Sequence, residues 1–144
     1  MQPASATVEN VRLGATILAF AALIAGAAEI TFVEPADLAA HLSAKPVIFY
    51  VGPNVMYRSK HIPGAVYAGP GNKAEGIELL KGAVAELPRD RDMVIYCGCC
   101  PWEKCPNVQP AMTTLQEMGF TRVRVLHLPD NFKTNWIDKG YPVE

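Results

Sequence analysis

The four cysteines of the chain lie together in one short segment. They occupy positions 97, 99, 100 and 105 of the stretch YCGCCPWEKCPN, which covers residues 96–107, and no other position holds a cysteine. Cysteines that hold a small fold together by disulfides are spread along the chain, so an even number within one loop indicates a reactive or metal-binding site. The chemistry expected of this loop is therefore the chemistry of sulfur.

The first of these residues, Cys97, lies where a predicted strand gives way to a loop and then a helix. The apolar run 93–96 leads directly into Cys97, and a helical pattern begins just after Cys105. A thiol between a strand end and a helix N-terminus is close to backbone N–H groups and to the positive end of the helix dipole, which favours the thiolate. Cys97 is therefore the predicted nucleophile.

The other three cysteines leave several interpretations open. One is a resolving or regulatory disulfide between Cys105 and either Cys99 or Cys100, another is a metal or Fe–S site, and the third is no chemical role. Cys99 and Cys100 are not expected to pair with each other, because a vicinal disulfide is strained. C-x-C-C-x4-C is not a usual zinc spacing and no histidine is near in sequence, so no metal ligand and no cofactor is assigned.

Strand-like and helix-like segments alternate around this loop. Apolar runs predict strands at 29–33, 47–51, 66–68, 93–96 and 123–128. Helices are expected from Pro35, over 77–87, from an N-cap at Asn107 to Gly119, and over 131–139, whereas 57–65 is expected to be a loop. Such alternation predicts an α/β fold of three layers, with a central, mostly parallel sheet covered by helices on both faces. Functional groups in such folds gather beyond the carboxyl ends of the strands, where Cys97 is placed.

Length and composition limit the other possibilities. With 144 residues, 50% of them apolar, there is room for one compact domain and a short extra segment. The formal net charge is −1 and no long basic run occurs, which argues against nucleic acid as a partner. The domain is predicted to span residues 29–144.

Residues 1–28 differ from the rest of the chain. The run 13–28 carries no charge, follows Arg12 and contains the small residues Ala25, Gly26 and Ala27. This pattern predicts a signal peptide with an A-x-A-like cleavage site, because 16 residues fall short of the roughly 20 that span a bilayer. There are two alternatives. One is an uncleaved N-terminal anchor, which would be the one expected membrane attachment, and the other is a buried helix. Export to the periplasm would place the cysteines in an oxidising compartment.

Three stretches of the chain resemble a known family. They are the turn His61-Ile62-Pro63-Gly64-Ala65, the strand that runs into the first cysteine at 94–97, and an ending made of 117–120, 123–126, Trp136-Ile137 and 140–142. In this order and spacing they resemble a single-domain rhodanese over roughly residues 30–144.

The resemblance implies a sulfurtransferase. Cys97 would take a sulfane sulfur from a small donor such as thiosulfate, hold it as a persulfide, and pass it to cyanide or to a thiol acceptor, which may belong to a protein. The intermediate is covalent, so the reaction would proceed in two steps.

The active-site loop departs from the family pattern. Rhodanese loops usually have an arginine six places after the cysteine, whereas this chain has Glu103 there and continues to Asn107. The missing arginine argues against the related phosphatases, which need a cation aimed at the phosphoryl oxygens. Lys104 could supply a positive charge, as a point charge rather than a fork.

A set of residues around Cys97 is predicted to bind the substrate. Trp102 is interpreted as a lid or acceptor-docking surface or as loop packing, and His61 as a residue that braces a turn. Two other functions remain open, a thiol–disulfide redox protein and a carrier of a soft ion such as Cu(I) or Zn(II). The predicted loop and substrate-binding residues are Gly98, Cys99, Cys100, Trp102, Glu103, Lys104, Cys105 and Arg58.

Overall fold

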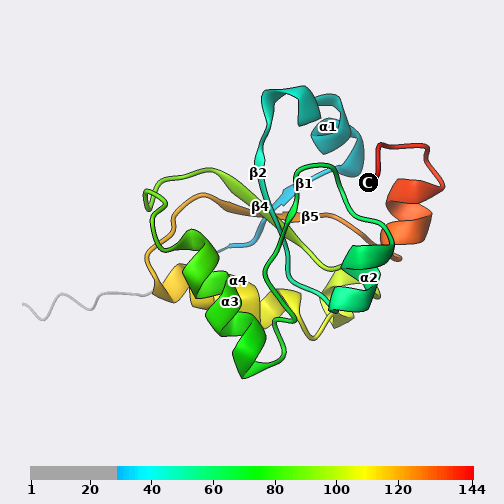
Figure 1. Cartoon of the computed structure of the whole chain (residues 1–144). Helices are drawn as coiled ribbons and strands as arrows, with labels where there is room; N and C mark the ends of the chain where they lie inside the picture. Colours follow the sequence, from blue (N-terminus) through cyan, green and yellow to red (C-terminus); the bar gives the residue numbers. More distant parts are fainter. Residues whose placement is uncertain (1–28) are drawn as a thin grey trace, which may run out of the picture.

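A computed structural model describes residues 29–144 of the chain, which form a five-stranded sheet with helices on both faces (Figure 1). All strand pairs are parallel, and the strand order is β1-β5-β4-β2-β3. This architecture confirms the predicted three-layer α/β fold. The strands are β1 (Thr31–Val33), β2 (Val47–Tyr50), β3 (Val66–Tyr67), β4 (Met93–Tyr96) and β5 (Val123–Leu126).

The helices divide into two groups. The longest, α3 (Ala74–Val84) and α4 (Val108–Glu117), contact each other and cover one face of the sheet. The opposite face packs against side chains of α1 (Pro35–Ala40), α2 (Asn54–Ser59) and the C-terminal helix, a π-helical segment at Lys133–Ile137. Two short 3-10 turns complete the set, Leu42–Ala44 after α1 and Trp102–Lys104 within the cysteine loop.

Side chains of the central strand β4 alternate between the two faces. Met93 and Ile95 belong to the apolar cluster under α3 and α4, whereas Val94 and Tyr96 belong to the cluster on the other face. Successive side chains of a strand point to opposite faces, so Cys97 continues the series of Met93 and Ile95. Its sulfur therefore lies on the side of the sheet that α4 covers, at the carboxyl end of β4.

The predicted strands agree with the structure to within two residues at each end, but one predicted loop and one predicted helix need correction. The segment 57–65 was expected to be a loop, yet its first residues belong to α2. This helix has six residues, none of them buried and no side-chain cap, so it is too short to show an apolar period. The second helix was expected to reach Leu87, but α3 ends at Val84.

The predicted signal peptide or anchor, residues 1–28, lies outside the described residues. Between residues 29 and 144, no helix combines the length and the apolar character that crossing a bilayer requires. Within the described residues, the cysteine loop is next to a cavity.

Candidate functional site

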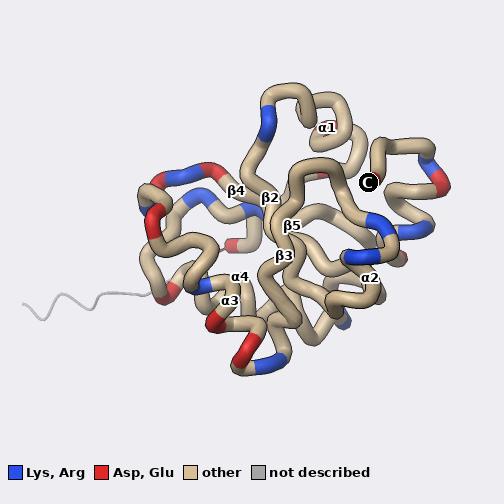
Figure 2. Tube along the Cα trace, viewed as in Figure 1, with Lys and Arg blue, Asp and Glu red and all other residues tan. Residues whose placement is uncertain are grey.

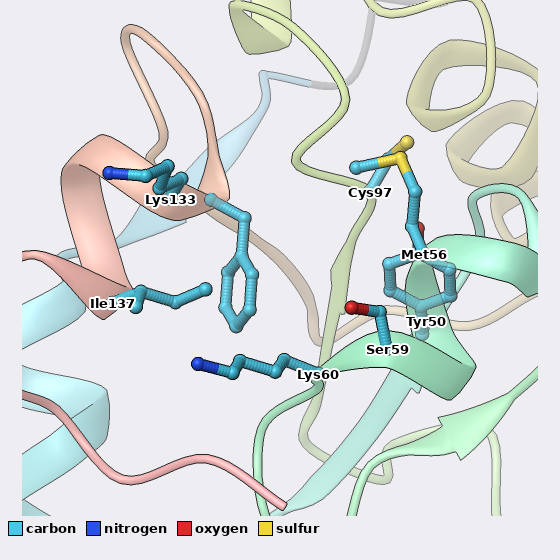
Figure 3. Close-up of a pocket in the computed structure, with 8 residues that line it drawn as sticks. Tyr50, Met56, Ser59, Lys60, Cys97, Lys133 and Ile137 are labelled. Atoms are coloured by element: carbon cyan, nitrogen blue, oxygen red, sulfur yellow. The ribbon is translucent and has the colours of Figure 1, made fainter.

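Cys97 lines a cavity of about 160 Å³ at the carboxyl end of the sheet. Its wall comes from three parts of the chain that are distant in sequence, namely the end of β2, the helix α2 and the C-terminal helix (Figure 3). Cys97 itself is 1% exposed, and the cavity gives a small reactant a route to its sulfur. The other lining residues are Tyr50, Met56, Ser59, Lys60, Phe132, Lys133 and Ile137.

Two glycines leave the space that the cysteine loop needs. Gly98 has a φ of +80°, and a Cβ at this position would collide with Phe132, whose backbone N–H donates to the Gly98 carbonyl at 3.0 Å. A Cβ on Gly52 would lie 2.6 Å from both the Cys97 sulfur and the Tyr50 hydroxyl. The predicted loop residue Gly98 therefore fixes the turn after the thiol, and Gly52 keeps the space beside that thiol open.

The loop brings three sulfur atoms together. Those of Cys97, Cys99 and Cys105 all lie within 4.8 Å of one another, and the Cys99 and Cys105 sulfurs are 3.8 Å apart. The Cys100 sulfur contacts Cys99 at 3.1 Å but is outside this group of three. The 3-10 turn Trp102–Lys104 makes this arrangement possible because it returns the chain to place Cys105 beside Cys99. The structure has all four cysteines as free thiols.

The two buried thiols Cys97 and Cys105 shift each other's pKa in opposite directions. Sharing of a proton with Cys97 lowers the pKa of Cys105 to about 5, and the backbone N–H groups of Asn107 and Val108 at the start of α4 act in the same direction. The same shared proton, together with burial, raises the pKa of Cys97 above its ordinary value. Burial also raises the pKa of Cys100, to about 12. The helix N-terminus expected to favour a thiolate at Cys97 thus favours one at Cys105.

Asn107 has a different role from the one predicted. It occupies the N-cap position of α4, yet its side chain makes no capping hydrogen bond. Its side-chain amide instead donates to the Cys97 sulfur at 3.4 Å, and its side-chain oxygen accepts from the Asn72 backbone at 3.2 Å. This buried amide therefore holds the Cys97 sulfur in place and can stabilise negative charge on it.

The Tyr50 hydroxyl is a buried polar group without a partner. Of the buried side-chain oxygens and nitrogens in residues 29–144, the Tyr50 hydroxyl is the one that makes no hydrogen bond. Its ring points toward Cys97 in Figure 3, and burial raises the pKa of Tyr50, so the hydroxyl keeps its proton. A buried hydroxyl usually has a hydrogen-bond partner, so this one is a donor available to an atom within the cavity.

Two lysines supply the positive charge at the cavity. Lys60 follows α2, and Lys133 begins the C-terminal helix, where it pairs with Asp138 at 2.8 Å. Figure 2 shows basic positions at the end of α2 and on the C-terminal helix on the same side of the molecule. The predicted Arg58 and Lys104 are exposed and do not line this cavity.

The remaining predicted loop residues face other surroundings. Trp102 packs edge-on against Phe32 of β1, with ring centroids 4.5 Å apart, and its backbone N–H donates to the Leu128 carbonyl at 3.1 Å. Trp102 therefore packs against β1 and does not line the Cys97 cavity. Glu103 is exposed and does not line the Cys97 cavity.

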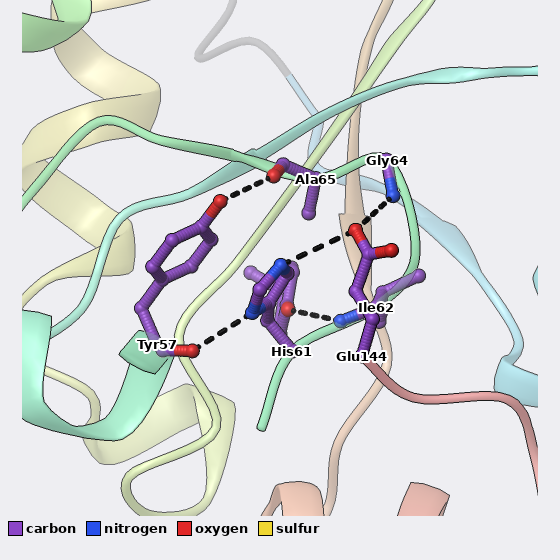
Figure 4. Close-up of polar contacts among 7 residues, drawn as sticks. Tyr57, His61, Ile62, Gly64, Ala65 and Glu144 are labelled. Atoms are coloured by element: carbon purple, nitrogen blue, oxygen red, sulfur yellow. Dashed lines mark hydrogen bonds and ion pairs between the residues drawn. The ribbon is translucent and has the colours of Figure 1, made fainter. Parts of the chain in front are cut away.

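His61 braces the turn that follows α2, as predicted (Figure 4). Its Nδ1 lies 2.8 Å from the Tyr57 carbonyl, its ring stacks on Tyr57, and its Nε2 is 3.3 Å from the Glu144 carboxylate. That carboxylate also accepts the Gly64 N–H at 2.9 Å. These contacts hold the HIPGA turn and the end of α2, and thereby one wall of the cavity.

The family model of the rhodanese-like domain matches residues 34–128. The chain belongs to the rhodanese-like domain family. No curated protein matches the sequence. The matched range contains the strands β2 to β5 and the whole cysteine loop, and it begins just after β1.

Solved structures of rhodanese-like proteins share this fold. The rhodanese-like domain of the Alr3790 protein from Anabaena sp. is 22% identical, with a TM-score of 0.59 over 81% of this chain and 80% of that one. A rhodanese-related protein from Thermoplasma volcanium is 18% identical, with a TM-score of 0.56 over 79% of this chain and 97% of that one. A protein of unknown function from Rhodopseudomonas palustris, described as a possible tyrosine phosphatase, is 21% identical. Its TM-score is 0.56 over 80% of this chain and 85% of that one. At these identities the likeness concerns the fold.

Several site residues could not be found from the sequence. Tyr50, Ser59, Lys60 and Lys133 come from three separate segments, and only the tertiary fold brings them to Cys97. One signal was present for Tyr50, since it stands at the end of a buried strand neighbouring β4, at the edge where Cys97 was placed. The lysines carried no such signal, because exposed lysines are common on any surface.

Proposed function

We propose that this rhodanese-like protein is a sulfurtransferase that carries a sulfane sulfur as a persulfide on Cys97. The observation that carries the proposal is the position of Cys97, a buried thiol that lines a cavity at the carboxyl end of the central strand. Membership of a sulfurtransferase superfamily supports the reaction class. The two lysines at the cavity favour an anionic donor such as thiosulfate.

The first half-reaction is a displacement at sulfur. As the Cys97 sulfur attacks the outer sulfur of thiosulfate, its proton passes to the Cys105 thiolate. A Cys97–sulfur bond forms, the sulfur–sulfur bond of thiosulfate breaks, and sulfite leaves with the electron pair of that bond. Oxidation states balance, because the sulfane sulfur is transferred without an external oxidant or reductant.

The second half-reaction returns the thiol. The thiolate of a small acceptor attacks the outer sulfur of the persulfide, and the electron pair of the broken bond returns to Cys97. While the persulfide exists, Tyr50 O–H and the Asn107 amide are the donors that face it. A cavity of about 160 Å³ favours a slender acceptor, such as cyanide or an extended thiol.

Intact-protein mass spectrometry tests the proposal. Reduced protein is incubated with thiosulfate, and we expect a mass gain of one sulfur that dithiothreitol reverses and that peptide mapping places on Cys97. Sulfate is the matched reagent, because it has the same charge but no sulfane sulfur, and it should leave the mass unchanged. Cys97→Ser, which keeps the size of the side chain, should abolish the gain.

Two results would overturn the proposal. One is the absence of any sulfur gain with thiosulfate and with an organic persulfide. The other is a gain of equal size in Cys97→Ser. Circular dichroism of the variant confirms that it is folded, so that a loss reflects chemistry.

A further inference from the structure

The cysteine loop has a second chemical capacity that sulfur transfer does not use. Three of its sulfur atoms, on Cys97, Cys99 and Cys105, face a common point, since all lie within 4.8 Å of one another. Transfer by a single persulfide needs one sulfur and a proton partner. Cys99 has no part in that reaction, yet its sulfur completes the triangle.

The dimensions of this triangle suit a bound metal ion. Metal–thiolate bonds of about 2.3 Å place sulfur ligands roughly 3.8–4.0 Å apart in tetrahedral or trigonal sites. The Cys99 and Cys105 sulfurs are 3.8 Å apart, and the Cys97 sulfur lies within 4.8 Å of both. The spacing C-x-C-C-x4-C gave no zinc signal because the 3-10 turn at Trp102–Lys104, rather than a zinc-knuckle turn, brings the sulfurs together.

The donor set selects the type of ion. All three ligand atoms are sulfur, and no histidine or carboxylate of residues 29–144 joins this group. Thiolate ligands suit both Cu(I) and Zn(II), but structural zinc sites are closed by four ligands, so a set of three sulfurs favours Cu(I). Cys97 and Cys105 are buried and Cys99 is half-exposed, so an ion could enter past Cys99 and then be shielded.

We propose that Cys97, Cys99 and Cys105 form a three-sulfur site for a soft monovalent cation, Cu(I). Cys100 is not a ligand, because its sulfur lies outside the triangle although it contacts Cys99. The site goes beyond the proposed sulfur transfer and shares Cys97 with it. A protein loaded with Cu(I) therefore has no free thiol at Cys97 to accept sulfur.

An anaerobic titration of the full, reduced chain with Cu(I), in competition with bicinchoninic acid, tests the site. We expect one Cu(I) per chain and a coordination shell of three sulfurs by X-ray absorption. Cys99→Ser and Cys105→Ser should weaken binding by at least about tenfold, because each removes one of three ligands. Cys100→Ser is the matched control, of the same residue type in the same loop, and should keep wild-type affinity.

The proposal fails if the competitor removes all Cu(I) from the wild type, if Cys100→Ser weakens binding as much as Cys99→Ser, or if Zn(II) binds while Cu(I) does not. Far-ultraviolet circular dichroism shows whether each variant is folded. These readouts do not depend on sulfur transfer, so failure of one proposal leaves the other standing. A link between the two is expected in one further measurement, in which Cu(I)-loaded protein gains no sulfur from thiosulfate.

Discussion

At the scale of single residues, Cys97 and Cys105 have neighbouring sulfurs but different surroundings. Cys97 opens onto the cavity, whereas Cys105 faces the first N–H groups of α4. The position that a reactant can reach is therefore not the position that holds the charge. Movement of one proton between two sulfurs is enough to put the charge on the nucleophile when a donor arrives.

This division predicts a pH dependence for the metal-free protein. The pKa of Cys105 is lowered to about 5, so the pair carries a thiolate at all pH values well above 5. In Cys105→Ser the charge must come from Cys97, and burial keeps its pKa at or above the ordinary value of 9.0. We expect persulfide formation at pH 7 to slow by at least about tenfold, with recovery as the pH rises past 9.

The rate of sulfur gain from thiosulfate, measured between pH 5.5 and 9.5, checks this prediction. Serine keeps the size of the side chain but has no thiolate, so the comparison isolates the charge. A wild-type pH profile in Cys105→Ser would show that Cys105 does not take the proton.

Two neighbouring tyrosines make a second matched test. The Tyr50 hydroxyl has no partner, whereas the Tyr96 hydroxyl oxygen accepts a hydrogen bond from the buried Ile62 N–H at 3.0 Å. Tyr50→Phe should slow persulfide formation several-fold, by about 1 kcal/mol, and leave the free energy of unfolding unchanged or slightly higher. Tyr96→Phe leaves the Ile62 N–H unpaired and should lower the free energy of unfolding by about 1–3 kcal/mol.

Urea denaturation and the transfer rate together separate the two roles. If Tyr50→Phe lost stability and kept its full rate, the hydroxyl would be a structural group and not a donor to the persulfide.

At the scale of elements, the structure shows which local signals can be read from sequence. The apolar runs at β2 and β4 identified their strands because a fully buried parallel strand needs side chains that are apolar on both faces. The helix α2 gave no such signal, since its six residues pack only partly. Yet α2 contributes Met56 and Ser59 to the cavity and leads into Lys60, so the cavity wall could not be predicted.

Asn107 shows a different limit. An asparagine before a helical pattern is a sound N-cap prediction, and the position is correct. Its side chain turns instead to Cys97, because the folded loop places that sulfur within reach and Asn72 binds its oxygen. Sequence reasoning identified the nucleophile candidate from local features, but the residues around it depend on contacts between distant segments.

The turn at Gly98 can be tested at the same scale. Gly98→Ala forces a left-handed φ on alanine and pushes a methyl group against Phe132, so we expect a loss of roughly 2–4 kcal/mol in the free energy of unfolding. Gly82→Ala in α3 is the matched control, because an added Cβ there meets nothing within 4 Å and alanine favours the helix. Gly82→Ala should be more stable than wild type by up to about 1 kcal/mol.

Urea unfolding of both variants, followed by circular dichroism, measures the difference. Equal stability of Gly98→Ala and wild type would mean that the loop adopts another turn with no cost.

At the scale of the whole molecule, Glu144 joins the C-terminal segment to the turn after α2. Its backbone exchanges hydrogen bonds with His61 in both directions at 3.0 Å, and its carboxylate accepts from Gly64 (Figure 4). These contacts fix the segment after the C-terminal helix against the turn after α2. The two elements that line the Cys97 cavity are therefore tied together at a point outside it.

This tie predicts a modest contribution to stability. Glu144→Ala removes the acceptor of the Gly64 N–H and the partner of His61, both at a partly exposed site, so we expect a loss of about 0.5–1.5 kcal/mol. Glu86→Ala is the control, because Glu86 is exposed and makes no ion pair with any residue from 29 to 144. Thermal unfolding compares the two, and an equal midpoint in both would show that the tie contributes nothing.

The strand order also governs when the sheet can be completed during synthesis. Among residues 29–144, the first strand, β1, pairs with β5 alone, in the register that aligns Thr31 with Arg124 and Val33 with Leu126. A ribosome that adds about 5–20 residues per second reaches β5 roughly 5–20 s after it has made β1. Throughout that interval β1 has no partner strand, so the nascent chain acquires its complete sheet only when most of the domain has been translated.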